Sequence, residues 1–291
     1  MTAINVLLQR ERAYLITDAA WYDAEGVLRN IAPKSVAVGH WPGAIATRGP
    51  GLANSVLATE AGLQFPDFDA FANGAAEFLK AWTERNAEHL AEWAEQGHVE
   101  VIAIGWSKSR DRTRGIFVSS RDDAAEATAR GIEADNDTRL ERAFEVFEIE
   151  SGYLRPQPTL EAMAAAGLDP DMDLETQPVL TGTGARIVVA QRELREPIMT
   201  GGDPVCFVGG FVVNTVVDRT GVHVSKGIAF PDEVGRRIEA TRGDAFWPHS
   251  ADHVPPPAGP PEPPPGLSRQ QRRAWEAQQR RKGAGRVRAV S

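Results

Sequence analysis

Thr2 has the side chain and the position needed for nucleophilic attack on an amide bond. It follows Met1, and a side chain this small usually allows the Met to be removed, which would leave Thr2 with a free α-amine. Such an amine has a pKa of about 7.7 to 8, so near neutral pH part of it is unprotonated and can accept the hydroxyl proton. Nucleophile and base would then come from one residue, a known way to activate a hydroxyl group.

Lys34 and Asp18 are the residues that we expect to support Thr2. A positive charge beside an amine lowers the pKa of that amine, and it also stabilises negative charge that forms on the hydroxyl oxygen. Lys34 would supply this charge. A partly buried ammonium without a partner is costly, so a carboxylate must hold the lysine charged and oriented. Asp18, at the end of an apolar run, is the residue expected in this role.

The spacing of these residues resembles that of N-terminal-nucleophile (Ntn) hydrolases of the proteasome β-subunit and HslV type. Thr2, Asp18 and Lys34 follow one another at intervals of sixteen residues. In that family a terminal Thr, an Asp on the second strand and a Lys at the start of the next strand have the same spacing. The resemblance implies that Gly49 lies where a backbone N–H of the family forms the oxyanion hole. It extends, more weakly, to about residue 235.

Some positions depart from the family pattern. Arg48 and Pro50 flank Gly49 where small residues are expected, and Pro50 has no backbone N–H to donate. The Ser and Asp that support the amine in the family have Ser151 and Asp218 as their nearest matches. Each residue of the site also has an ordinary explanation, since Met-Thr starts are common, an Asp after a strand often belongs to a turn, and a Lys after Pro can be a solvated strand end.

Short runs of apolar and β-branched residues must position the site. The expected strands, most of them in hairpins, are 4–8, 13–17, 27–31, 35–38, 44–47, 99–106, 115–119, 144–149, 205–217 and 222–230. The pattern changes to helical spacing after residue 51. The expected helices are 52–63, 69–96, 122–142, 159–166 and 184–196. Asp67 and Asp69 are candidate caps of the helix 69–96, and Gly97 is its expected end.

Strands at both ends of the sequence, with helices between them and little βαβ alternation, favour an α+β fold. We expect two packed antiparallel sheets covered by helices on both sides. The resemblance also implies this four-layer αββα sandwich.

Composition restricts the classes of function. The formal net charge of −8 argues against a general nucleic-acid binder. A single cysteine, Cys206, excludes an internal disulfide and suits a reducing cytoplasm. The start of the sequence lacks the features of a secretion signal, and the longest apolar run is too short to span a bilayer. The six histidines show no metal-binding spacing, so we expect neither a metal nor a cofactor.

The sequence divides into three parts. Residues 1–235 form the expected Ntn-hydrolase-like domain, 236–265 an irregular segment with a Pro-rich linker, and 266–291 a basic tail that is disordered or a short helix. The tail is expected to be a solvated segment, a peptide that docks on an acidic protein partner, or a contact to nucleic-acid phosphates, in that order of preference.

Two functions follow from this pattern. The leading hypothesis is an N-terminal threonine amidohydrolase that acts on peptide or amide substrates. The alternative is an inactive subunit of the same fold that serves in an assembly, with the basic tail as a tether. The resemblance implies a homo-oligomer in either case, because members of the family usually assemble into rings.

Overall fold

The computed structural model describes most of the chain up to residue 239. The described residues are 2–23, 25–51, 53–93, 98–122, 142–169, 171, 173, 179, 182–197 and 204–239. They belong to one compact unit, Met1–Arg242. Nearly all of the helix expected over 122–142, and the chain from residue 240 on, lie outside the described residues. The expectations for these segments, and the boundaries at 235 and 265, therefore stay predictions.

One five-stranded antiparallel sheet contains the first hairpin of the chain. Its strand order is β10-β1-β2-β13-β14. The bounds are β1 Ile4–Leu8, β2 Arg12–Thr17, β10 Gly152–Arg155, β13 Phe211–Asp218 and β14 Gly221–Ala229. The hairpin expected from residues 4–8 and 13–17 is confirmed, with Val6 opposite Leu15. β10 was not expected, because its four residues are too short a run to be recognised.

A second five-stranded antiparallel sheet has the order β5-β6-β7-β8-β9. The bounds are β5 Ser35–Ala37, β6 Gly43–Arg48, β7 Glu100–Ser107, β8 Arg112–Ser119 and β9 Val146–Ile149. Two short ladders complete the described strands, and their bounds are β3 Ala20–Tyr22, β4 Leu28–Ile31, β11 Glu196–Pro197 and β12 Pro204–Val205. Helices and antiparallel sheets together make this an α+β protein, as expected.

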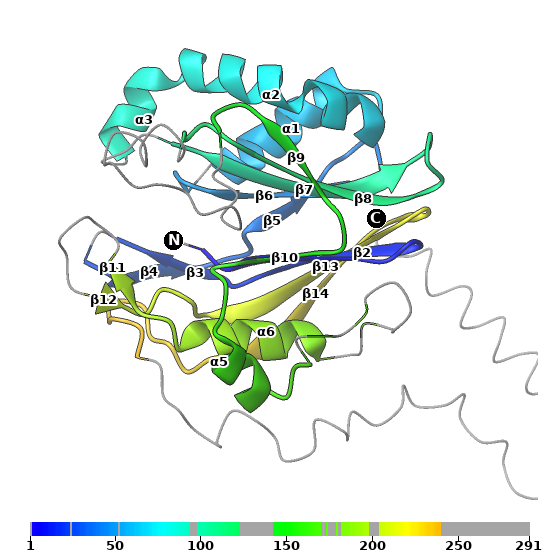
Figure 1. The fold of residues 1–291 in the computed structure, drawn as a ribbon. Helices are drawn as coiled ribbons and strands as arrows, with labels where there is room; N and C mark the ends of the chain where they lie inside the picture. Colours follow the sequence, from blue (N-terminus) through cyan, green and yellow to red (C-terminus); the bar gives the residue numbers. More distant parts are fainter. Residues whose placement is uncertain are drawn as a thin grey trace, which may run out of the picture. The chain divides into compact units, whose positions relative to one another are not determined.

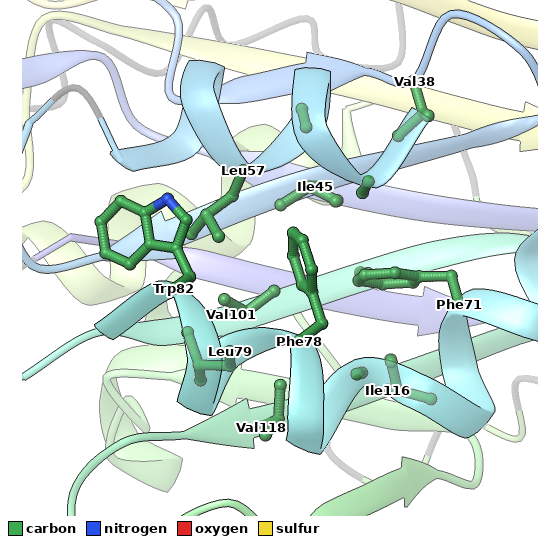
Figure 2. Close-up of a cluster of buried hydrophobic side chains, with 14 of the residues drawn as sticks. Val38, Ile45, Leu57, Phe71, Phe78, Leu79, Trp82, Val101, Ile116 and Val118 are labelled. Carbon is green, nitrogen blue, oxygen red and sulfur yellow. The ribbon is translucent and has the colours of Figure 1, made fainter. Parts of the chain in front are cut away.

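Three helices cover the outer face of the sheet β5–β9 (Figure 1). They are α1 Ala53–Gln64, α2 Phe68–Arg85 and α3 Ala87–Trp93. The apolar side chains of α2 recur at helical spacing and pack with Leu57 of α1 onto Val101 and Ile116 of the sheet (Figure 2). Asp67 caps α2, because its carboxylate accepts a hydrogen bond from the Ala70 N–H at 3.0 Å.

The expectation of one helix over residues 69–96 is wrong, because α2 and α3 are separate helices. The break is at Asn86, whose φ of −110° and ψ of 16° are not helical. The Asn86 side chain donates to the Trp82 carbonyl at 2.8 Å. A short amide side chain that binds the backbone in this way competes with helix propagation. The apolar periodicity continues across Asn86, so the sequence pattern does not reveal the break between the two helices.

Two further helices, α5 Leu160–Ala165 and α6 Thr183–Arg192, lie on the far side of the other sheet (Figure 1). α6 contacts β13 closely. At Gly184 a Cβ atom would lie 2.5 Å from the Asn214 side-chain oxygen, so only glycine allows this approach. Thr159 caps α5, because its hydroxyl accepts a hydrogen bond from the Ala162 N–H.

The facing sides of the two sheets share one apolar core. It joins Ile4 and Leu15 of the first sheet to Ala46, Ile102 and Phe117 of the second. Period-two alternation along each strand sends these residues inward and their neighbours toward the helices. The first sheet therefore has one buried face toward the second sheet and one toward α6.

The single strand expected over residues 205–217 is wrong. The chain leaves β12 at Val205, makes an isolated bridge at Cys206, and enters β13 only at Phe211. Gly210 has a φ of +75°, which favours glycine and interrupts the extended backbone. This interruption belongs to the site described next.

Candidate active site

The first hairpin brings the start of the chain to Asp18. Ile4 pairs with Thr17, so the residues before β1 lie beside the residues after β2. The Ala3 N–H donates to Asp18 Oδ1 at 3.1 Å. Thr2 therefore lies at the end of the hairpin, next to the carboxylate.

Lys34 reaches the same point from the other sheet. It precedes β5, and the Asn54 side chain on α1 holds its backbone by donating to the Lys34 carbonyl at 3.1 Å. The Lys34 ammonium lies 2.9 Å from Asp18 Oδ1 and 3.4 Å from Thr2 Oγ1. The structure thus brings together the three residues that the sequence spacing singled out.

Lys34 and Asp18 form a buried ion pair. Lys34 is 4% exposed and Asp18 is 0% exposed. Burial lowers the pKa of Lys34 below its ordinary value of 10.5, Asp18 opposes this change, and the nearby Arg48 charge adds to it. The Tyr22 ring lies 5.7 Å from the ammonium and offers a further cation contact.

Asp18 accepts hydrogen bonds from four donors. Besides Ala3 and Lys34, it accepts from the Ala20 N–H at 3.1 Å and the Gly209 N–H at 3.2 Å. These donors satisfy both oxygens of a carboxylate that is removed from water. Gly209 was not predicted as a site residue. The only signal in the sequence is a pair of glycines inside an apolar run.

Gly49 follows β6 in an exposed turn. Its φ is +124°, and a Cβ atom there would lie 2.7 Å from the His98 carbonyl oxygen, so the turn requires glycine. The turn also packs closely on Trp21, because a Cβ atom on Gly51 would lie 2.4 Å from that ring. The oxyanion role of Gly49 stays a prediction.

Ser151 and Asp218 do not lie near Thr2, contrary to expectation. The Ser151 carbonyl accepts from the N–H of Leu8, at the other end of β1. Asp218 pairs with Arg12, also at that other end. Six residues of extended strand separate Leu8 from Thr2, a distance of roughly 20 Å at about 3.3 Å per residue. Neither side chain can support the Thr2 amine.

Arg48, which departs from the family pattern, belongs to a buried ion cluster with Glu100 and Arg155. The Arg48 guanidinium lies 3.1 Å from Glu100 Oε2, and that of Arg155 lies 3.2 Å from Oε1. Burial raises the pKa of Glu100, but the two arginines outweigh it and hold this pKa below its ordinary value of 4.5. Two arginines against one carboxylate leave an excess of positive charge on the side of Lys34.

Other kinds of site find little support in the described ranges. There, His, Cys, Asp and Glu side chains form no group of three or more that could hold a metal ion. None of the described helices is both long and apolar enough to cross a bilayer. No model of a known protein family matches the chain, and no curated protein is similar enough in sequence to count as a relative. Function must therefore be inferred from the geometry of the site.

Proposed function

We propose that the protein is an N-terminal threonine amidohydrolase of the Ntn type, related to the proteasome β-subunit and HslV, that acts on peptides. The observation that carries the proposal is the position of the Lys34 ammonium, between Thr2 Oγ1 at 3.4 Å and Asp18 Oδ1 at 2.9 Å. An amine-bearing hydroxyl beside a buried ammonium is suited to nucleophilic attack near neutral pH.

The reaction begins when removal of Met1 frees the Thr2 amine. Thr2 Oγ attacks the carbonyl carbon and forms a C–O bond, while the hydroxyl proton passes to the amine, directly or through a water molecule. The N–H of Gly49 stabilises the negative charge on the carbonyl oxygen. The C–N bond then breaks, the leaving amine takes the proton, and water hydrolyses the ester that remains on Thr2.

Lys34 and Asp18 prepare the nucleophile without forming bonds to substrate. The ammonium favours the unprotonated form of the Thr2 amine and stabilises negative charge on Oγ. Asp18 keeps the ammonium in place, since three backbone N–H groups fix the carboxylate. The excess positive charge of the Arg48 cluster acts in the same direction as Lys34.

The proposed architecture is a four-layer αββα sandwich. Its support is that α1 and α2 contact the sheet β5–β9, that α6 contacts β13, and that the two sheets share a core. In this arrangement the start of β1 and the start of β5 lie at the same end of the facing sheets, as an N-terminal nucleophile requires.

The proposal is tested with variants of the nucleophile. We expect Thr2→Ala, and protein that retains Met1, to lose hydrolysis of a panel of fluorogenic peptides, whereas Thr2→Ser keeps part of it. Thr59→Ala is the matched control, because the exposed Thr59 hydroxyl donates only to the Ser55 carbonyl on α1. Intact mass measures the removal of Met1. Equal turnover by native protein and Thr2→Ala would contradict the proposal.

The second candidate is an inactive subunit of the same fold in a homo-oligomer. The observation that favours it is the position of Ser151 and Asp218, both far from Thr2. This candidate predicts that Met1 stays on the purified protein and that the peptide panel is not cleaved. Light scattering coupled to size exclusion would then show an assembly in which Thr2→Ala has no effect.

A further inference from the structure

Another buried ion pair, between Arg192 and Asp232, lies beside the site. Arg192 is the last residue of α6, and Asp232 follows β14. Their contact is bidentate, with Nη2 2.5 Å from Oδ1 and Nη1 2.9 Å from Oδ2. The side chains are only 6% and 4% exposed. A pair buried to this degree gains little net stability over apolar residues of similar volume, so a role other than stability deserves a test.

Both members of the pair also hold the turn at residues 208–210. Arg192 Nη1 donates to the Val208 carbonyl at 2.8 Å, and the Gly210 N–H donates to Asp232 Oδ2 at 2.7 Å. The guanidinium lies 4.4 Å from the centre of the Phe230 ring, and the Phe230 N–H donates to the Gly210 carbonyl. The turn is therefore fixed on both sides of its central residue.

That central residue is Gly209, one of the donors to Asp18. A Cβ atom on Gly209 would lie 2.4 Å from Asp232 Oδ2 and 3.0 Å from Arg192 Nη1. The ion pair thus packs directly against the Gly209 backbone. The Gly209 carbonyl accepts from the Ala19 N–H at 3.1 Å, so the peptide is tied to the segment that carries Asp18.

We propose that Arg192 and Asp232 are positioning residues, which hold the Gly209 N–H against Asp18 and thereby fix the carboxylate that orients Lys34. An arginine is needed because its planar guanidinium makes the bidentate contact and the carbonyl contact together, which a lysine cannot do. The effect on Thr2 rests on the proposed function. The effect on Gly209 does not.

The first experiment measures hydrogen exchange of the Gly209 amide by NMR in the full-length protein. We expect Arg192→Lys to speed this exchange about tenfold or more, because the turn opens locally. The matched control is Arg114→Lys, which changes a similarly enclosed pair with Asp69, 3.1 Å apart and 10% and 17% exposed, on the other sheet. Unchanged Gly209 exchange in Arg192→Lys, or equal acceleration in the control, would overturn the proposal.

A double variant distinguishes a positioning role of the ion pair from a contribution of the pair to global stability. In Arg192→Met with Asp232→Leu, apolar side chains replace the pair, which is expected to leave global stability near the native value. We still expect fast Gly209 exchange, and kcat on the cleaved peptide is expected to fall about tenfold or more with little change in KM. Native exchange in a stable double variant would contradict positioning. Fast exchange with no peptide cleavage by the native protein would contradict only the proposed function.

Discussion

Lys34 carries a charged side chain that is almost fully buried, with 4% of the residue exposed. Burial lowers the pKa of its ammonium, and the neighbouring Asp18 carboxylate opposes that change. The unfolded chain binds this proton more tightly than the folded protein does. Between the lowered folded pKa and 10.5, the unfolded state therefore carries more protons, and the free energy of unfolding rises with pH.

Lys34→Met tests this reasoning. It leaves the Asp18 carboxylate buried without its cation, which is expected to cost about 3–5 kcal/mol of stability near pH 7. Peptide cleavage is expected to fall at least about 100-fold, since the Thr2 hydroxyl loses its neighbouring charge. Urea unfolding from pH 7 to 10.5 measures the loss of stability. In Lys34→Met, the free energy of unfolding should rise less with pH over that interval than in the native protein. An equal rise in both proteins would contradict the lowered pKa of Lys34.

The residues of the site differ in how far the sequence predicts them. Thr2, Asp18 and Lys34 were predictable because all three lie within the first 34 residues, next to short strands that the apolar pattern reveals, at a spacing that resembles the family pattern. Gly209 was not, because 191 residues separate it from Asp18, and no periodicity reports such a contact. Ser151 and Asp218 failed for the related reason that strand register decides which end of the β1–β2 hairpin each one reaches.

Helices and strands show the same limit to what the sequence predicts. Apolar spacing located most of the described strands and helices, because side-chain burial repeats every two residues in a strand and every 3.6 in a helix. The short strands β3, β10 and β11 were not expected. Two of the errors, at Asn86 and at residues 206–210, occur where a side chain or a glycine changes the backbone but leaves the apolar pattern intact. Burial patterns cannot report such breaks.

The cap of α2 is the element whose contribution can be isolated. Asp67→Ala removes the acceptor for the Ala70 N–H and is expected to cost about 1 kcal/mol in urea unfolding. Asp67→Asn is the control, because Asn caps helices as well as Asp does and only the charge near Lys108 is lost. If both variants lose equal stability, the contact to Lys108 and not the cap is responsible.

At the scale of the whole molecule, one ion cluster joins the two sheets beside the site. Arg48 and Glu100 belong to β6 and β7 of the second sheet, whereas Arg155 belongs to β10 of the first. The core that the two sheets share is apolar, and other polar contacts between the sheets are the Lys34–Asp18 pair and the hydrogen bond between Ser35 Oγ and Thr215 Oγ1 at 2.8 Å. Apolar contacts are not directional and do not select a single alignment strongly. The paired charges do, because a shift of one sheet against the other would separate the buried Glu100 from Arg155.

Glu100→Gln is expected to destabilise the protein by about 3–5 kcal/mol at pH 7, because Arg48 and Arg155 lose the buried carboxylate that pairs with both. The pKa of Glu100 is lower in the folded protein than its ordinary value of 4.5. The Glu100 carboxylate therefore stabilises the folded state above pH 4.5, and this stabilisation is lost as the pH falls through the folded pKa. The difference in free energy of unfolding between native protein and Glu100→Gln should therefore shrink below pH 4.5 in urea titrations.

Glu148→Gln, which removes a carboxylate that is 41% exposed, is the control and should cost less than about 1 kcal/mol. A difference for Glu100→Gln that stays constant down to acid pH would show that the lost volume or hydrogen bonds, and not the charge, hold the sheets in register.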